Sequence, residues 1–165
     1  MKNNFFYLLV IILFCNFLFT KTLGEVQFNF NVSEIEILEN GNLIKGLKKG
    51  VVNTNDGLSI TADEFEYDKS KNILNATGNV KIEHKQKNYL IYSDGITYFK
   101  NDEKIKTTKN SKAIFENNKI IEANRFLFDN SKNILNAVGK VKIENKLENY
   151  FIYSDEVNYF KNEGN

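Results

Sequence analysis

The stretch "KNILNATGNVKIE" (residues 71–83) decides the fold, because it recurs almost unchanged as "KNILNAVGKVKIE" (residues 132–144). Between residues 60–104 and residues 121–165, 27 of 45 positions are identical. The same offset of 61 residues continues more faintly towards the N-terminus, into the segment that begins near residue 31. A fixed internal period indicates a repeat architecture. We therefore expect two copies of about 61 residues, followed by the start of a third.

Apolar and polar residues alternate strictly within this stretch. Its apolar or small residues fall on one parity and its polar residues on the other: Leu74, Ala76, Gly78, Val80 and Ile82 against Asn75, Thr77, Asn79, Lys81 and Glu83. This alternation is typical of a β-strand with one buried face. Polar, turn-forming interruptions recur about every 8–16 residues along the chain. The pattern predicts an all-β sandwich, barrel or roll.

A phase slip interrupts the alternation once in each copy. In "SITADEFEYD" (59–68), Ile60 and Ala62 share one parity, whereas Phe65 and Tyr67 share the other. The second copy repeats the slip at the corresponding place. A slip of one residue moves side chains to the opposite face, so the strand must bulge or turn a corner there to keep them inside. The alternative, that Ile60 belongs to a separate short strand, stays open.

Each copy also places a glycine, Gly78 or Gly139, on the inward parity of a strand. Such a glycine leaves a gap, permits a close approach, or marks a bulge. Small residues among large aromatic ones favour an interior shaped as a lined trough, and a bulge is the competing interpretation.

The first 24 residues have the order of a secretory signal. Lys2 precedes an apolar run from Phe5 to Phe19, and a short polar tail ends at Gly24. The run is shorter than the roughly 20 residues that a membrane-spanning helix needs. We therefore expect a signal peptide, helical and cleaved, over residues 1–24, and one domain over residues 25–165. An uncleaved anchor is the alternative.

The composition excludes several function classes. Residues 25–165 keep 20 of the 22 basic residues and all 21 acidic residues, so a net charge of −1 gives no reason to expect nucleic-acid binding. They contain no cysteine, and the chain's one histidine, His84, lies in a lysine-rich turn where we expect it to be solvated. Asp63 becomes Asn124 in the second copy. We expect no enzyme activity, no cofactor and no metal site.

The residues of the repeat resemble a known family. The phrase Ala62-Asp63, Tyr67-Asp68, Leu74, Ala76 and Gly78-Asn79-Val80 is similar to the recurring motif of the organic-solvent-tolerance (OstA-like) periplasmic domain of the lipopolysaccharide transport (LptA/LptD/LptC) family. The second copy departs from that motif at Asn124, Phe128 and Lys140, which favours an architectural role for these polar positions.

This resemblance implies a β-jellyroll or β-taco fold in the periplasm of a Gram-negative bacterium, in some members associated with the outer membrane. It implies a protein that shields the lipid A acyl chains of lipopolysaccharide in an apolar trough. It further implies docking to other bridge proteins by β-strand augmentation, or head-to-tail to a second copy. A structural or adhesive β-repeat filament subunit and a membrane-anchored LptC-like component remain as alternatives.

The parity of the strands gives the candidate site residues. The lipid-contacting interior is expected to comprise Phe65, Tyr67, Leu74, Ala76, Val80, Ile82, Tyr98, Phe115, Phe126, Phe128, Leu135, Val141 and Ile143. The edge strands expected to dock are represented by Phe28, Phe30, Val32, Val157 and Tyr159. No catalytic residue is assigned.

Overall fold

The structure is a computed structural model that describes residues 28–116 and 118–161. These residues form twelve β-strands and two short 3-10 helices, with no α-helix among them, so the all-β fold class is confirmed. The elements are β1 (Phe28–Leu38), η1 (Glu39–Gly41), β2 (Leu43–Thr54), β3 (Leu58–Ala62), β4 (Glu64–Asp68), β5 (Ile73–His84), β6 (Tyr89–Phe99), η2 (Lys100–Asp102), β7 (Lys104–Thr107), β8 (Ser111–Phe115), β9 (Lys119–Ala123), β10 (Arg125–Asp129), β11 (Ile134–Asn145) and β12 (Tyr150–Phe160).

The segment 1–24, which we expect to be a signal peptide, lies outside the described residues. Within the described part of the chain, no helix is long and apolar enough to cross a membrane.

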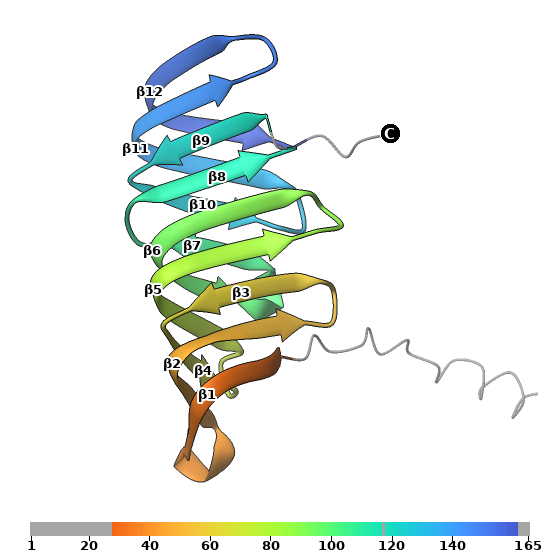
Figure 1. Cartoon of the computed structure of the whole chain (residues 1–165), viewed down its shortest axis with the longest axis vertical. Coiled ribbons are helices and arrows are strands. Elements are labelled where there is room, and N and C mark those ends of the chain that lie inside the picture. The colour runs from red at the N-terminus through yellow and green to blue at the C-terminus, as the bar shows by residue number, and fades with distance from the viewer. Residues whose placement is uncertain (1–27, 117, 162–165) are drawn as a thin grey trace, which may run out of the picture.

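All twelve strands belong to one antiparallel sheet that is stacked along the long axis of the molecule (Figure 1). β1 pairs only with β2 at one end, and β12 pairs only with β11 at the other. In between, β6 pairs with β5 on one side and with both β7 and β8 on the other. The stack therefore begins and ends in a strand with one free edge.

The sheet is folded over a line of corners that crosses its strands. In β5, Gly78 and Asn79 lie opposite the single residue Asp94 of β6, and both have positive φ angles of 77° and 49°. β11 bulges in the same way at its corresponding residues. Between β3 and β4 the chain breaks its pairing at Asp63, whose N–H donates to the carbonyls of Thr77 and Gly78. We call this row of bends the corner line.

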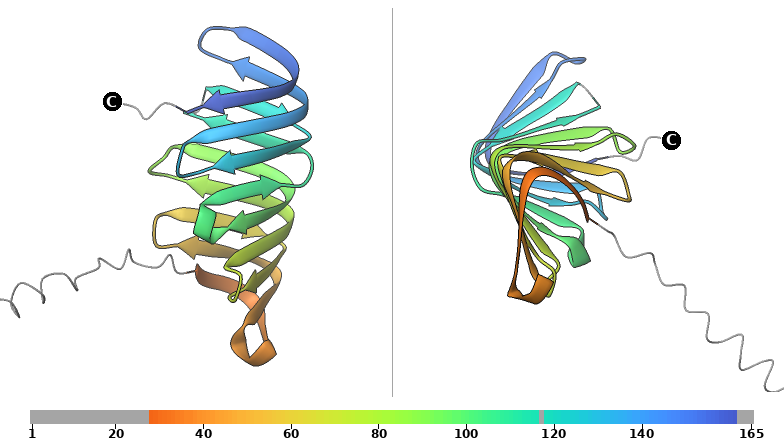
Figure 2. Two further views of the ribbon diagram at one scale, coloured as in Figure 1. Left: turned by 180° about the vertical axis from the view of Figure 1, so that it is seen from behind. Right: turned by 60° about the horizontal axis from the view of Figure 1, so that its bottom comes forward.

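The corner line divides the sheet into two half-sheets that face each other (Figure 2, right). Half-sheet A contains β3, β8 and β9 with residues 28–32, 50–54, 80–84, 89–93, 141–145 and 150–154. Half-sheet B contains β4, β7 and β10 with residues 34–38, 43–47, 73–77, 95–99, 134–138 and 156–160. We call the long opening opposite the corner line, where the strand ends of A face those of B, the mouth.

The phase slip in the sequence is explained by this corner. β3 and β4 both pair with β2 and with β5, so they are two parts of one bent strand rather than unrelated strands. The two glycines belong to the corner and not to a gap left for a ligand. A Cβ on Gly78 would overlap the side chain of Asp63, and a Cβ on Gly139 would overlap that of Asn124. The bulge interpretation is therefore the correct one.

The 61-residue spacing is visible in the strand boundaries. β3, β4, β5 and β6 begin and end 61 residues before β9, β10, β11 and β12. β2 differs from its counterpart, since it continues through the corner line as one strand, whereas residues 104–115 are split into β7 and β8.

The core lies between the half-sheets. Alternate residues of every strand point inwards, and the resulting cluster joins both copies into one core. Burying each large apolar side chain contributes roughly 1.5–3 kcal/mol. This single interior is the candidate site that the fold positions.

Candidate functional site: the aromatic interior and its mouth

The thirteen residues expected to face the interior all do so. Each is at most 8% exposed, and all belong to the core cluster. Sequence reasoning missed further members, such as Tyr89, Ile91 and Ile96 in β6 and Ile121 in β9. The alternation in β6 was the available signal, but its phase also shifts at Asp94, on the corner line.

The interior is packed rather than hollow. Side chains of the two half-sheets fill it, and the largest of them, including Tyr98, Phe115, Phe126 and Phe128, are less than 2% exposed. This differs from the open trough that the glycines indicated, because those glycines are covered by Asp63 and Asn124. Whatever enters the interior must therefore separate the half-sheets.

Aromatic rings meet across the mouth along the stack. Phe28 in half-sheet A contacts Tyr67 in half-sheet B edge-on, with ring centroids 4.7 Å apart. Further along, Tyr89 meets Phe128 at 5.0 Å, and Phe115 meets Tyr159 at 4.9 Å. These contacts are apolar and non-directional, so they oppose separation without fixing one geometry.

One polar contact closes the middle of the mouth. Tyr89 donates its hydroxyl to Oδ1 of Asn130 at 3.0 Å, and Nζ of Lys87 donates to the Asn130 carbonyl at 2.7 Å. Asn130 is only 1% exposed and Tyr89 only 2%. We call Lys87, Tyr89 and Asn130 the latch. Among the described residues, no backbone hydrogen bond outside the strands joins half-sheet A to half-sheet B at the mouth.

His84 lies beside the latch and corrects an expectation. It ends β5 and is 2% exposed, so it is not solvated. Its Nδ1 accepts a hydrogen bond from the backbone N–H of Lys87 at 3.3 Å. Burial, reinforced by the charges of Lys87 and Lys161 and opposed by Asp56, lowers the pKa of His84 below its usual 6.5. Because this turn packs against the opposite half-sheet, the lysines flanking His84 do not keep it in water.

The edge strands expose apolar side chains at both ends of the stack. The predicted docking residues Phe28, Phe30, Val32, Val157 and Tyr159 are half-buried, since they pack against the core. The exposed residues are others: Ile37 at 63% on β1, and Ile152 at 45% on β12. The 61-residue offset could have identified them, because their counterparts Tyr98 and Ile91 are fully buried.

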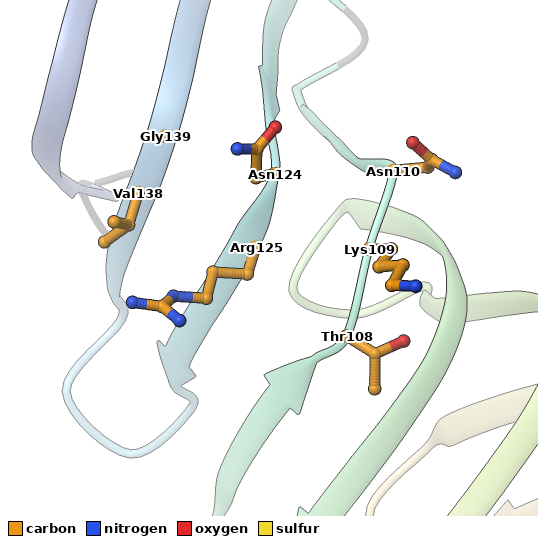
Figure 3. Close-up of a pocket in the computed structure, with 7 residues that line it drawn as sticks. All are labelled: Thr108, Lys109, Asn110, Asn124, Arg125, Val138 and Gly139. Atoms are coloured by element: carbon orange, nitrogen blue, oxygen red, sulfur yellow. The ribbon is translucent and has the colours of Figure 1, made fainter.

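The largest cavity lies outside the interior, at the corner line of the second copy (Figure 3). It has a volume of about 520 Å³ and is lined by Thr108, Lys109, Asn110, Asn124, Arg125, Val138 and Gly139. Figure 3 shows the Arg125 side chain extending towards Val138. Its mostly polar lining does not suit a hydrocarbon chain.

The carboxylates are placed structurally. Asp63 Oδ2 accepts from Asn79 Nδ2 at 2.7 Å, and Asp94 Oδ2 accepts from Asn110 Nδ2 at 2.7 Å, both on the corner line. In the ranges 28–116 and 118–161, no three His, Cys, Asp or Glu side chains gather in a group that could hold a metal ion.

Comparison with known proteins gives two findings. Residues 59–165 match the family described as "LptA/(LptD N-terminal domain) LPS transport protein". A similar solved structure is that of LptH from Pseudomonas aeruginosa, described as the LptA homologous periplasmic component of the conserved lipopolysaccharide transport device. It has a TM-score of 0.62 at 18% sequence identity, over 68% of this chain and 82% of that chain. This likeness supports the β-jellyroll fold. No curated protein sequence matches.

Proposed function

Because the chain belongs to the LptA/LptD N-terminal family of lipopolysaccharide transport proteins, we propose that it is a periplasmic bridge component that shields the acyl chains of lipopolysaccharide in its interior. The observation that carries this proposal is the continuous aromatic and aliphatic core, which lies between two half-sheets joined covalently and by hydrogen bonds only through the strands.

The interior suits a ligand that slides. Burial of apolar area stabilises a bound chain by roughly 25 cal/mol per Å² without requiring one orientation. The acyl chains would replace contacts between the two half-sheets, while the sugars would stay in water outside the mouth. The thirteen interior residues predicted from parity would then be the lipid contacts.

Docking at the two ends is the second part of the proposal. β1 and β12 each have one free edge, and unpaired edges are templates for strand addition. The ends are also offset. At the β1 end, Ile35 and Ile37 of half-sheet B extend past half-sheet A, and at the β12 end, Tyr150 and Ile152 of half-sheet A extend past half-sheet B. Such complementary steps fit another jellyroll of the bridge, or a second copy of this chain.

The periplasmic location rests on the family and on the proposed signal at residues 1–24. The mass of the protein recovered from the periplasm tests it: a mature N-terminus at Glu25 supports a cleaved signal. Retention of the full chain in the inner membrane supports the anchored LptC-like alternative.

A structural filament subunit is a second candidate, because a densely packed interior with two exposed apolar ends would also suit a β-repeat that polymerises. Photocrosslinking separates the two. A photoreactive phenylalanine analogue at Phe65 or Phe126, both inside, should form an adduct with labelled lipopolysaccharide in Gram-negative cells. The same analogue at the outward neighbours Glu66 and Leu127 should not.

An adduct from the inward positions alone supports transport. Equal labelling from inward and outward positions, or no glycolipid adduct at any of them, would contradict it and favour the filament.

A further inference from the structure

Tyr98 in β6 carries a hydroxyl that the fold does not use. The residue is 0% exposed, and its neighbours in register are Leu74 in β5 and Ile105 in β7. The Phe28 ring lies 6.0 Å away on the opposite half-sheet. Among the described residues, the Tyr98 hydroxyl has no hydrogen-bond partner.

The second copy shows what such a hydroxyl normally has. Tyr159 occupies the position of Tyr98 in the repeat, and Nζ of Lys119 lies 5.9 Å from its ring centroid. The two groups interact, and Tyr159 raises the pKa of Lys119. In the first copy, the position of Lys119 is taken by Leu58, which is 1% exposed and offers no polar atom.

A buried hydroxyl without a partner destabilises a protein, because it loses its hydrogen bonds to water and gains none. Phenylalanine would fill the same space in this core without that loss, so packing alone does not explain the tyrosine. An interior polar atom of this kind is useful only if something that enters the interior bonds to it.

We propose that the Tyr98 hydroxyl hydrogen-bonds a hydroxyl group carried on a bound acyl chain, so that the interior prefers hydroxyacyl chains to plain ones. This inference rests on the proposed function, because an acyl chain must first enter the interior.

The position of Tyr98 fits this ligand. It lies two residues before Lys100, which begins η2 at the mouth, and the Phe28 ring that meets it lies 5.7 Å from Nζ of Lys100. A hydroxyl near the head of an acyl chain would therefore reach Tyr98 while the tail lies deeper between Leu74 and Ile105.

Competition of palmitic acid and 3-hydroxypalmitic acid against a fluorescent fatty acid tests the inference on the full chain. The two acids share the carboxylate and the tail, so a difference between them reports the hydroxyl alone. The wild type should bind the hydroxy acid about fivefold more tightly, the size expected for one hydrogen bond. Tyr98→Phe should bind both acids alike. The matched control Tyr159→Phe should keep the preference.

The melting temperature is the second measurement. Tyr98→Phe should melt no lower than the wild type, because it removes an unsatisfied group, whereas Tyr159→Phe should melt lower. A wild type that binds both acids equally, a preference that survives in Tyr98→Phe, or a Tyr98→Phe that melts clearly lower would each overturn the inference. If the wild type binds neither acid, the proposed function itself fails, and the inference fails with it.

Discussion

At the scale of single residues, the corner line depends on a pairing of glycine with a polar side chain. Gly78 has a φ of 77°, a backbone conformation that residues with a Cβ rarely adopt, and the Asp63 side chain covers the place where a Cβ would be. Asn124 covers Gly139 in the same way. The aspartate of the motif is therefore replaceable by its amide, since its shape and hydrogen bonding matter more than its charge.

Gly78→Ala is expected to destabilise the fold by about 1–3 kcal/mol, because it adds both backbone strain and an overlap with Asp63. Gly41→Ala is the control: Gly41 also has a positive φ, of 91°, but nothing lies within 4 Å of its Cβ position. It should lose only about 1 kcal/mol. Denaturant unfolding measures both. The double variant Asp63→Ala/Gly78→Ala should recover part of the loss; no recovery would show that the overlap is unimportant.

His84 makes stability depend on pH. Its pKa is lowered in the folded state, chiefly by burial, so the unfolded chain binds a proton more readily than the folded one. Its contribution is complete above pH 6.5, and stability falls as the pH drops below that value. Melting curves of His84→Gln should show a smaller loss between about pH 6.5 and pH 5 than those of the wild type. Parallel curves for the two proteins would contradict this assignment.

At the scale of elements, the latch connects β6 and its preceding turn to the start of the β10–β11 turn. It is the polar fastening of a mouth that is otherwise closed by aromatic contacts. The latch is also central: Phe28 stands at the corresponding place in the first copy and Tyr150 in the third. Fastening it should hold the half-sheets together.

A covalent bridge across the mouth should block lipid uptake. In a Cys15→Ser background, Lys87→Cys/Asn130→Cys joined by a short reducible bifunctional thiol reagent should bind fluorescent fatty acid at least tenfold more weakly. A reductant should restore binding. The control pair Asn88→Cys/Glu116→Cys lies on half-sheet A alone, where the Glu116 N–H donates to the Asn88 carbonyl at 3.2 Å, and its bridge should have no effect. Unchanged binding by the bridged latch would mean that lipid does not enter there.

Much of the element scale could be predicted from the sequence. Strict alternation located β5 and β11, and the phase slip located the corner between β3 and β4. The thirteen inward residues followed from parity, because the side-chain period of a strand is two. The closure of the mouth could not be predicted, since Lys87 and Asn130 are 43 residues apart and form neither a motif nor a repeat equivalence. The burial of His84 escaped for the same reason.

At the scale of the whole molecule, the two ends decide what the stack can join. The repeat continues through the chain, but the facing strand is missing at each end of the described residues, opposite Ile37 at one end and Ile152 at the other. Inward positions thereby become surface. The prediction of docking strands was correct in naming β1 and β12 as edges, and the contribution of their individual side chains to docking stays a prediction.

Head-to-tail association should therefore depend on these ends. If a second copy is a partner, the wild type should form larger species as its concentration rises, and Ile37→Lys or Ile152→Lys should keep it monomeric without changing its melting temperature. Leu127→Lys is the control, because Leu127 is 44% exposed on the outer face of β10, away from both ends. Light scattering after gel filtration measures the mass. A wild type that stays monomeric throughout would leave other bridge proteins as the partners.

The ladder of strand pairing runs without a break from β1 to β12, whereas only side chains hold the mouth shut. Stretching the stack would rupture backbone hydrogen bonds at every rung, but spreading the half-sheets flexes only the corner line. The protein is thus mechanically anisotropic, stiff in length and compliant in bore. A span assembled from such units could widen to pass a bulky cargo and narrow behind it while the distance between its anchorages stays constant.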